Sequence, residues 1–452
     1  MFETDVLNPT KGSRPGLAVA GIISMAAAAF LFFSTRQLIP DIAWLLEGSR
    51  RWLDGQQLYR DIIEVNPPMA FYTAVALSGG ILSGPAYIAG NCIALALSSL
   101  WVLRLRGPYA AFAALAAMLL GGLTDFGQRD HLALIFVIPF LFAGSARFPE
   151  RVALGLWAFI GVGLKPHLLA IPIAAALARA VLDKSMRPLV APELVSLGIA
   201  SAAYLCLAFL LHPAYFADIV PLARFVYGAY GSPVKVELAG LSVVLVLVGG
   251  LALLLGERRT VPLAAAMLAG LASFYLQGRN WSYHFVPALG LGILLSILLA
   301  RHHRAALPLA VVLCAGQLVR GPHQPMPSAP FSERSVAVLS AHVFAAYPRA
   351  VHNATRYPAL WTLPGAWNAL NDPGRSATDR ERARRILEHE RAIIRADILR
   401  DRPDAIYAHA NRTKRYFRRP FDYMEFLGPL PGYRFVGRRE NEGYVYDVYR
   451  RE

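Results

Sequence analysis

Apolar runs of membrane-spanning length alternate with short polar segments along the first 320 residues of this chain. The polar segments are of two kinds that follow one another in turn. The first kind is short and basic, and comprises Lys11 with Arg14, Arg104 with Arg106, Arg147 with Arg151, Lys184 with Arg187, Arg258 with Arg259, and Arg301 with Arg304. The second kind mixes carboxylate, amide, imidazole and aromatic groups, and comprises residues 36–68, 125–131, 165–167, 212–237 and 277–284. Because short cytoplasmic loops concentrate Lys and Arg, we expect the basic kind inside and the mixed kind outside.

The apolar runs predict about eleven transmembrane helices, since a span requires roughly 20 residues. The expected spans cover residues 16–34, 86–103, 108–123, 131–146, 152–164, 167–183, 189–211, 238–256, 261–277, 283–300 and 305–320. The run 69–83 is expected not to cross by itself, because an even number of crossings must separate two outward-facing segments. It is also short, and it ends among Gly79, Gly80, Gly84 and Pro85. The predicted fold class is an α-helical polytopic membrane protein with a cytoplasmic N-terminus and an external C-terminus.

The chain changes character after residue 320, where the apolar runs stop and prolines at 322, 325, 327 and 330 predict a stiff linker. Ser376 and Asp379 resemble a capping box, with Asp in place of Glu, and open a charged helix that reaches about Leu399. Its buried stripe is expected to hold Ile386, Leu387, Ile393, Ile394 and Ile398. Strands are expected at 404–408, 433–436 and 444–449, the last two joined by a turn at 441–443. The predicted domains are a transmembrane domain in 1–320 and a small extramembrane α/β or α+β domain in 321–452.

Composition agrees with a membrane protein, because 56% of the residues are hydrophobic and only 17% are charged. Residues 16–34 are expected to be a retained first helix, since the run is long for a signal peptide and lacks a small-residue cleavage site. Cys92, Cys206 and Cys314 fall inside apolar runs and imply no disulfide framework. An Arg-rich and Ala-rich chain without a eukaryotic targeting signal suggests a bacterial inner membrane.

The outer loop 36–68 carries the strongest functional signal. It places Asp41 directly after the first span, ahead of an amphipathic helix. We expect the apolar face of this helix, with Trp44 and Trp52, to lie in the membrane interface, while Glu47, Arg50, Arg51 and Asp54 face water. The loop then continues through Tyr59-Arg60-Asp61 to Asn66-Pro67-Pro68.

This order of residues resembles the first external loop of GT-C glycosyltransferases of the protein-mannosyltransferase and aminoarabinose-transferase type. The resemblance covers roughly the first 170 residues, and it implies a membrane enzyme that transfers a sugar from a polyprenyl phosphate to an acceptor. It makes Asp41 the catalytic carboxylate. Residues 125–131 correspond to the second external acidic motif of the family, through either Asp125 or Asp130. Trp281-Ser282-Tyr283-His284 looks like a Trp-x-Tyr-His element of some bacterial members.

The chemistry is also reasonable without the family. Nucleotide sugars are confined to the cytoplasm, so an outward-facing transferase needs a lipid-linked donor whose leaving group is a phosphate. A carboxylate must take the acceptor proton, and fixed cations must stabilise the departing phosphate. The expected catalytic residues are Asp41, Asp125 and Asp130. The expected substrate-binding residues are Glu64, Asn66, Arg129, His131, Lys165, His167, Arg279, Trp281, Tyr283 and His284. The acceptor would be a glycan, glycolipid or protein, and neither a nucleic acid nor a cofactor is expected.

Other interpretations of the same residues stay open. Asp41 could be a solvated residue or a helix N-cap, and Asp125 and Asp130 could form a cap and an ion pair with Arg129. Lys165 could extend its ammonium group to the interface, and His284 could belong to an aromatic belt. A divalent cation could bind between the carboxylates, although no His or Cys spacing demands a metal. A transporter or flippase of lipid-linked sugars and a non-catalytic scaffold are the alternative functions.

The alternation of basic and mixed segments predicts that residues 125–131 and the C-terminal domain share the outer side with the loop 36–68. Single cysteines placed at Ser145 and at Ser376, in a chain whose native cysteines are replaced, should therefore react with an impermeant thiol reagent from opposite sides of the membrane. Labelling of both positions from the same side would contradict the predicted topology.

Overall fold

The computed structural model describes residues 15–36, 38–230, 235–256, 258–320, 333–341, 351–410, 416–441 and 444–452. The chain divides into two compact units. The first comprises Met1–Arg36, Tyr72–Leu207 and Ser232–Gln324, and the second comprises Gln37–Phe71, Ala208–Gly231 and Pro325–Glu452. The second unit therefore groups the loop after the first helix with the C-terminal segment, where the sequence suggested a division at residue 320. The turn at 441–443 and the linker prolines lie largely or wholly outside the described residues.

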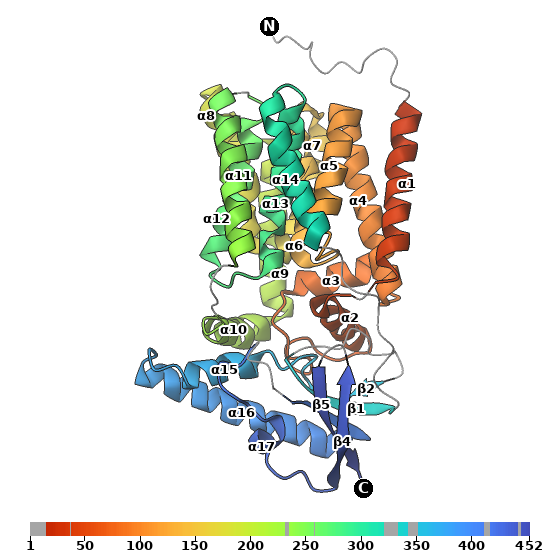
Figure 1. Cartoon of the computed structure of the whole chain (residues 1–452), viewed down its shortest axis with the longest axis vertical. Coiled ribbons are helices and arrows are strands. Elements are labelled where there is room, and N and C mark those ends of the chain that lie inside the picture. The colour runs from red at the N-terminus through yellow and green to blue at the C-terminus, as the bar shows by residue number, and fades with distance from the viewer. Residues whose placement is uncertain are drawn as a thin grey trace. The chain divides into compact units, whose positions relative to one another are not determined.

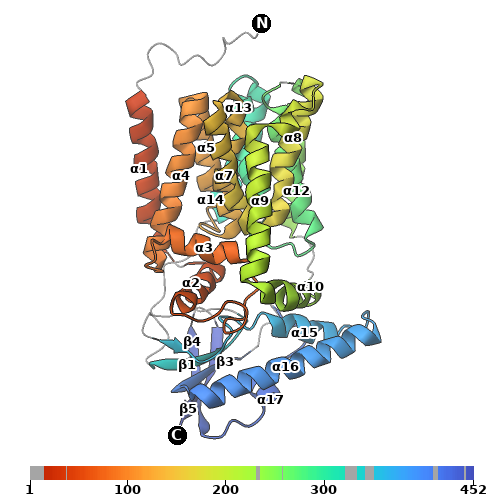
Figure 2. The same cartoon turned by 180° about the vertical axis from the view of Figure 1, so that it is seen from behind.

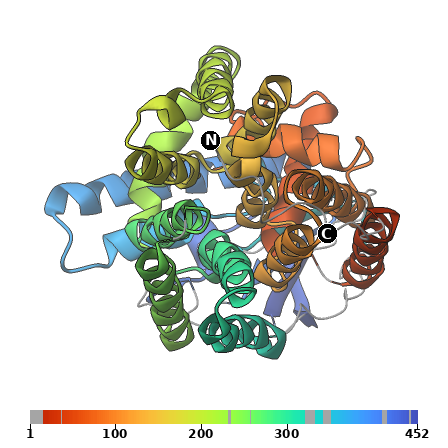
Figure 3. The ribbon, with the colours of Figure 1, turned by 90° about the horizontal axis from the view of Figure 1, so that it is seen from above.

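The first unit is a bundle of helices (Figures 1 and 2), which Figure 3 shows end-on. Its helices are α1 (Pro15–Phe33), α4 (Gly84–Arg106), α5 (Pro108–Gly121), α6 (Arg129–Val137), α7 (Phe148–Leu164), α8 (Ala170–Asp183), α11 (Val236–Leu255), α12 (Val261–Leu276), α13 (Val286–Ala300) and α14 (Leu307–Arg320). Two further helices, α3 (Pro68–Leu77) and α9 (Pro192–Leu211), contribute residues to both units. Short helical turns are η1 (Pro139–Ser145), η2 (Pro166–Leu169), η3 (Arg187–Val190), η5 (Ser282–Phe285) and η6 (Arg304–Ala306).

Within the described residues, six helical segments are long and apolar enough to cross a membrane. They are Gly16–Phe33, Gly84–Arg106, Pro166–Asp183, Pro192–Leu211, Val236–Leu255 and Ser282–Ala300. Several of these helices expose large apolar side chains, as Leu207 and Leu254 do, which suits a lipid environment. The chain is therefore a helical protein with membrane-spanning character, and the count of eleven spans stays a prediction. The expected span 131–146 is divided between α6 and η1, each too short to cross alone.

The run 69–83 forms the ten-residue helix α3, which is too short for a span. The chain turns after it at Gly79 and Gly80, whose φ angles of 59° and 74° favour glycine. Gly90 of α4 lies directly against Leu77 at the end of α3, since a Cβ atom at Gly90 would come within 1.9 Å of the Leu77 carbonyl oxygen. The absence of a side chain at Gly90 thus permits the two helices to meet.

The helix α13 is largely buried in the first unit, with contacts to α5, α6, α11, α12 and α14. Small residues make this crowding possible. A Cβ atom at Gly121 of α5 would lie 3.0 Å from the Cα atom of Gly290, and one at Gly270 of α12 would lie 3.3 Å from the backbone nitrogen of Ala288. Such close approach between backbones is a common basis of helix association in membranes. In η5, the turn that leads into α13, His284 and Phe285 are buried.

The second unit contains a five-stranded mixed sheet of order β2-β1-β3-β5-β4. Its strands are β1 (Ser335–Leu339), β2 (His352–Asn353), β3 (Ala405–His409), β4 (Tyr433–Asn441) and β5 (Tyr444–Arg451). The pairs of β1 with β2 and β3 are parallel, and the pairs of β5 with β3 and β4 are antiparallel. The three strands expected from the sequence correspond to β3, β4 and β5. Strands β1 and β2 were not expected, because β1 is a short apolar segment and β2 spans only two residues.

The helices of the second unit are α2 (Pro40–Leu53), α10 (Val220–Tyr227), α15 (Thr362–Leu370), α16 (Ala377–Asp401) and α17 (Tyr423–Leu427), with a π-helical turn at Tyr215–Ile219. The capping prediction is confirmed, because the Ser376 side chain accepts a hydrogen bond from the Asp379 backbone N–H at 3.0 Å. Trp44 of α2, Val226 of α10 and Trp361 belong to one apolar cluster, which also includes residues of α15 and α16. The loop after the first span is thus packed into the core of this unit.

The amphipathic prediction for α2 is wrong for two charged residues, because Glu47 and Arg51 are buried within the second unit. Glu47 forms an ion pair with Arg50 of the next helical turn. The Arg51 guanidinium donates to the side chain of Gln56 at 2.8 Å and to the carbonyl oxygens of Asp61 and Thr355 at 3.0 and 2.8 Å. Arg51 therefore connects the loop to Thr355 of the C-terminal segment, which lies about 300 residues away in the sequence.

Glu390 lies in the middle of the buried stripe of α16, only 1% exposed, one helical turn from Leu387 and Ile394. No described cation pairs with it, whereas Asp397 further along the stripe pairs with Arg356 at 3.0 Å. Burial raises the pKa of Glu390 from 4.5 to about 7, although the neighbouring hydroxyl groups of Tyr357 and Thr362 lower it. The carboxyl group is therefore largely protonated at mildly acidic pH.

This buried carboxyl group predicts a pH dependence of stability. Between pH 4.5 and 7 the folded state binds more protons than the unfolded state, so the stability falls as the pH rises through this window, by about 3 kcal/mol in total. Glu390→Gln should remove this component and raise the melting temperature most above pH 7. The check is thermal unfolding from pH 4.5 to 8, with the exposed neighbour Glu388→Gln as control. Equal slopes for Glu390→Gln and the unaltered chain would contradict the assignment.

Candidate functional site

Two charged residues predicted from the sequence form a buried ion pair in the first unit. Asp130 lies in the first turn of α6, which begins after Gln128, and the Gln128 side chain accepts a hydrogen bond from the Asp130 backbone N–H at 2.6 Å. Lys165 follows the last residue of α7. Its Nζ atom lies 2.9 Å from Asp130 Oδ2, and the side chains are 9% and 0% exposed. Because neither charge could be buried alone at small cost, the two helix ends are held together.

An aromatic group from the segment before α13 meets this ion pair. The Lys165 ammonium lies 5.4 Å from the ring centroid of Tyr283, which in turn lies 4.5 Å from the ring of His284. Trp281 packs against both rings, with centroid distances of 5.6 and 5.5 Å. The Arg279 guanidinium lies 5.8 Å from the Trp281 ring centroid. Both cation–ring distances are in the range where the ring quadrupole attracts a positive charge.

His284 is the most informative member of this group. Its side chain is 3% exposed, and neither ring nitrogen has a hydrogen-bond partner among the described residues. Lys165, Arg279 and Arg129 all lie close enough to act on it electrostatically, as does the more exposed His167. Because most buried polar groups are hydrogen-bonded, an imidazole without a partner among the described residues is a candidate for contact with a ligand.

His131 has a different environment from the one that the sequence suggested. Its Nδ1 atom accepts a hydrogen bond from the Gly127 backbone N–H at 3.0 Å, and its Nε2 atom lies 2.8 Å from the Met118 carbonyl oxygen, which it can reach only as a donor. A Cβ atom at Gly122 would overlap the imidazole ring. Both ring nitrogens are thus used inside the bundle, so we assign His131 a structural role and leave it out of the candidate site.

The two registers of the 125–131 motif are separated by the structure. Asp125 accepts a hydrogen bond from the Thr124 hydroxyl at 2.9 Å and lies in the turn before α6, whereas Asp130 meets Lys165. Tyr87 of α4, which precedes this turn in the sequence, stabilises it, because its hydroxyl donates to the Gly127 carbonyl oxygen at 2.7 Å. The sequence offered no signal for Tyr87, since it lies inside an apolar run.

The remaining predicted residues belong to the second unit. Asp41 lies in the first turn of α2 and is partly exposed, and the N-cap position is occupied by Ile39 without a side-chain hydrogen bond. Asp41 is therefore not the helix cap, although its charge suits the positive end of the helix dipole. Glu64 is fully buried and accepts hydrogen bonds from the backbone N–H groups of Val65 and Asn66 at 2.7 and 3.0 Å. Glu64 thus shapes the chain before α3.

The described residues contain no group of three or more His, Cys, Asp or Glu side chains that could hold a metal ion. The candidate site comprises Arg129, Asp130, Lys165, His167, Arg279, Trp281, Tyr283 and His284, which we call the first-unit cluster. In comparisons with known proteins, no protein-family model matches this chain, and no curated protein is significantly similar to it.

Proposed function

We propose that the first-unit cluster binds the phosphate of a polyprenyl-phosphate sugar and that the chain is a membrane glycosyltransferase. The observation that carries the proposal is His284, a buried imidazole with both nitrogens unpaired among the described residues, beside Lys165 and Arg279. A phosphate oxygen placed there would accept hydrogen bonds from several donors at once. Charge-assisted hydrogen bonds of this kind are stronger than neutral ones.

The cations of the cluster suit an anionic ligand. Arg129, Lys165 and Arg279 lie around His284, and Asp130 pairs with Lys165. Asp130 also fixes the position of the Lys165 ammonium, so that less reorganisation is needed when negative charge develops on a leaving group. The aromatic rings of Trp281 and Tyr283 offer flat surfaces of the kind on which a sugar ring can pack.

The proposed reaction is a single displacement. An acceptor hydroxyl oxygen attacks the anomeric carbon of the donor, and the bond from that carbon to the phosphate oxygen breaks. The electron pair leaves with the phosphate, whose charge is stabilised by the first-unit cluster. The acceptor proton passes to a carboxylate, for which the resemblance of the 36–68 loop to GT-C enzymes nominates Asp41. A single displacement inverts the anomeric configuration.

The convergence of side chains also bears on the alternative functions. A scaffold that only displays the C-terminal domain would not need Asp130, Lys165, Arg279 and His284 to meet. A flippase of lipid-linked sugars could use the same cluster to bind its cargo, and it differs from a transferase in leaving the bond between sugar and phosphate intact. Release of free polyprenyl phosphate in the presence of an acceptor therefore separates the two functions.

Loss of the phosphate contacts should weaken use of the donor. Arg279→Met is expected to lower kcat/KM for the donor by roughly 10-fold to 100-fold, which corresponds to 1.5 to 3 kcal/mol for a hydrogen bond to a charged group. Lys165→Met is tested together with Asp130→Asn, because a lone buried carboxylate would destabilise the fold. Transfer is measured with purified protein and a panel of polyprenyl-phosphate sugars. Arg147→Met, a basic residue outside the cluster, is the control, and unchanged donor kinetics in both test variants would exclude this site.

Asp41→Asn should bind donor but lose transfer. The substitution keeps the size of the side chain and removes its basicity, and general-base catalysis contributes about 10² to 10⁴-fold. The unaltered enzyme should form a product of inverted anomeric configuration, which NMR of the product can establish. Asp54→Asn, at the exposed far end of the same helix, should retain activity. Near-normal turnover of Asp41→Asn would contradict its role as the base, and a retained configuration would contradict the single displacement.

A further inference from the structure

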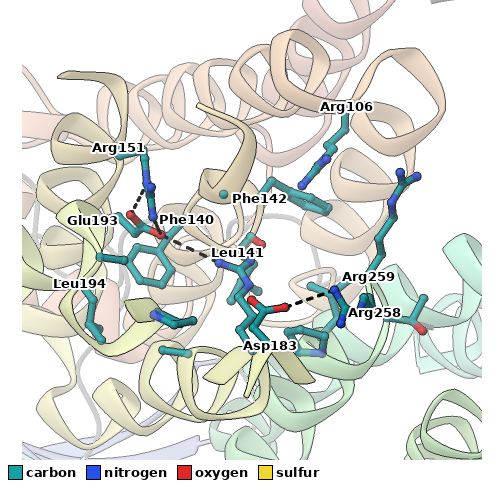
Figure 4. Close-up of a pocket in the computed structure, with 18 of the residues that line it drawn as sticks. Arg106, Phe140, Leu141, Phe142, Arg151, Asp183, Glu193, Leu194, Arg258 and Arg259 are labelled. Carbon is teal, nitrogen blue, oxygen red and sulfur yellow. Dashed lines mark hydrogen bonds and ion pairs between the residues drawn. The ribbon is translucent and has the colours of Figure 1, made fainter. Parts of the chain in front are cut away.

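The basic junctions, which the sequence marked only as topological signals, surround a single cavity of about 1170 Å³ in the first unit (Figure 4). Arg106 comes from the end of α4, Arg151 from the start of α7 and Arg179 from the last turns of α8. These residues lie at the opposite end of α7 from Lys165. With about 1.5 Å of rise per residue, the 17 residues of this helix separate the cavity from the first-unit cluster by roughly 25 Å.

Four further arginines lie around the same cavity. Arg187 belongs to η3, Arg258 and Arg259 lie in the turn before α12, and Arg301 follows α13. All four are exposed. The lining therefore brings together residues from junctions that are far apart in sequence, at one end of the helices. Such a convergence is more than a positive-inside bias requires, because that bias needs charge on one side and no particular geometry.

The arginines exceed the carboxylates that could neutralise them. Glu193 is 3% exposed and takes two hydrogen bonds from Arg151 at 2.6 and 3.0 Å, with Arg179 at 3.9 Å. Asp183 pairs with Arg258 at 3.6 Å. Among the described residues that line the cavity, seven arginines stand against these two carboxylates, an excess of five positive charges.

Some of these arginines lie close enough to repel one another. Arg179 and Arg259 both lie close enough to Arg106 to oppose its positive charge. No described carboxylate forms an ion pair with Arg106 or Arg259, and the guanidinium of Arg301 lies 5.1 Å from the Tyr109 ring centroid. A bound polyanion would relieve this repulsion. The guanidinium group is well suited to phosphate, since its planar fork matches two phosphate oxygens.

The cavity also has an apolar wall. Figure 4 shows Phe140, Phe142 and Leu194 beside the arginines. This combination fits a molecule with a phosphate head and an apolar body, and basic pockets between membrane helices are known to hold anionic lipid head groups. We propose that this cavity is a binding site for a phosphate-bearing anion, supplied by the head group of an anionic membrane phospholipid. The site is separate from the proposed donor site and does not depend on the transfer reaction.

Binding should stabilise the fold, because one ligand would connect the ends of α4, α8, α13 and the turn before α12. The test uses the full chain, purified in a zwitterionic detergent and depleted of lipid. Its melting temperature is measured as phosphatidylglycerol, phosphatidylcholine or inorganic pyrophosphate is added. Phosphatidylglycerol should raise the melting temperature in a saturable way, and phosphatidylcholine should not. An equal, saturable effect of pyrophosphate would support the phosphate site and assign it to a soluble anion.

Variants connect the effect to the cavity. Arg106→Gln with Arg259→Gln should raise the half-saturating concentration of phosphatidylglycerol at least about tenfold, since two charge-assisted contacts are lost. Arg147→Gln with Arg304→Gln removes the same charge from exposed junction residues outside the lining and should leave it unchanged. If the first pair does not fold, Arg187→Gln with Arg301→Gln tests the exposed rim. No shift with any phosphate compound, or equal weakening by test and control pairs, would overturn the proposal.

Discussion

The buried ion pair between Asp130 and Lys165 is the interaction on which the candidate site depends. A carboxylate and an ammonium group removed from water are each costly to bury, and each is tolerated here because the other lies 2.9 Å away. Their pairing brings the start of α6 to the end of α7. The Lys165 ammonium then lies beside Tyr283, and through this ring the segment before α13 joins the same group. The arrangement explains why residues from three separate polar segments form one cluster.

The first unit thus has distinct chemistry at the two ends of its helices. One end combines cations with imidazole and aromatic rings, and contains His284, whose ring nitrogens have no partner among the described residues. The other end is dominated by arginine, with Glu193 and Asp183 as the carboxylates of the cavity lining. A polyprenyl-phosphate sugar that must react needs hydrogen-bond donors in fixed positions and flat surfaces for its sugar. A lipid head group that only stabilises the fold needs charge alone. The two proposals therefore assign different ligands to the two ends.

The second unit treats its buried charges in two ways. Arg51 is matched by three acceptors and Asp397 by two arginines, so both remain charged and fix the positions of their neighbours. Glu390 has no described cation, and burial raises its pKa until the neutral form is favoured near pH 6. Its place on the α16 stripe is set by helical periodicity, because positions 387, 390 and 394 lie on one face. A buried carboxyl group that no described cation pairs with thus makes the stability of this unit depend on pH.

Local rules were enough to determine much of this protein from its sequence. The apolar runs, the change of character after residue 320, the Ser376 cap and three strands depend on neighbours within a few residues, and the sequence displays those neighbours directly. The run 69–83 is expected not to cross because an even number of crossings must separate two outward-facing segments, and its helix α3 has only ten residues. Asp130, Lys165, Arg279 and His284 were identified as candidates because polar residues between apolar runs are conspicuous.

The tertiary structure decided what the sequence could not. His131 and His284 look equivalent in sequence, yet one has both nitrogens bonded inside the bundle and the other has neither bonded among the described residues. Asp130 meets Lys165 because of how α6 and α7 pack. Arg51 is buried where the distant C-terminal segment meets it. Each of these outcomes depends on contacts between segments that are far apart in the chain, and such contacts are set by packing in three dimensions, which local sequence patterns do not encode.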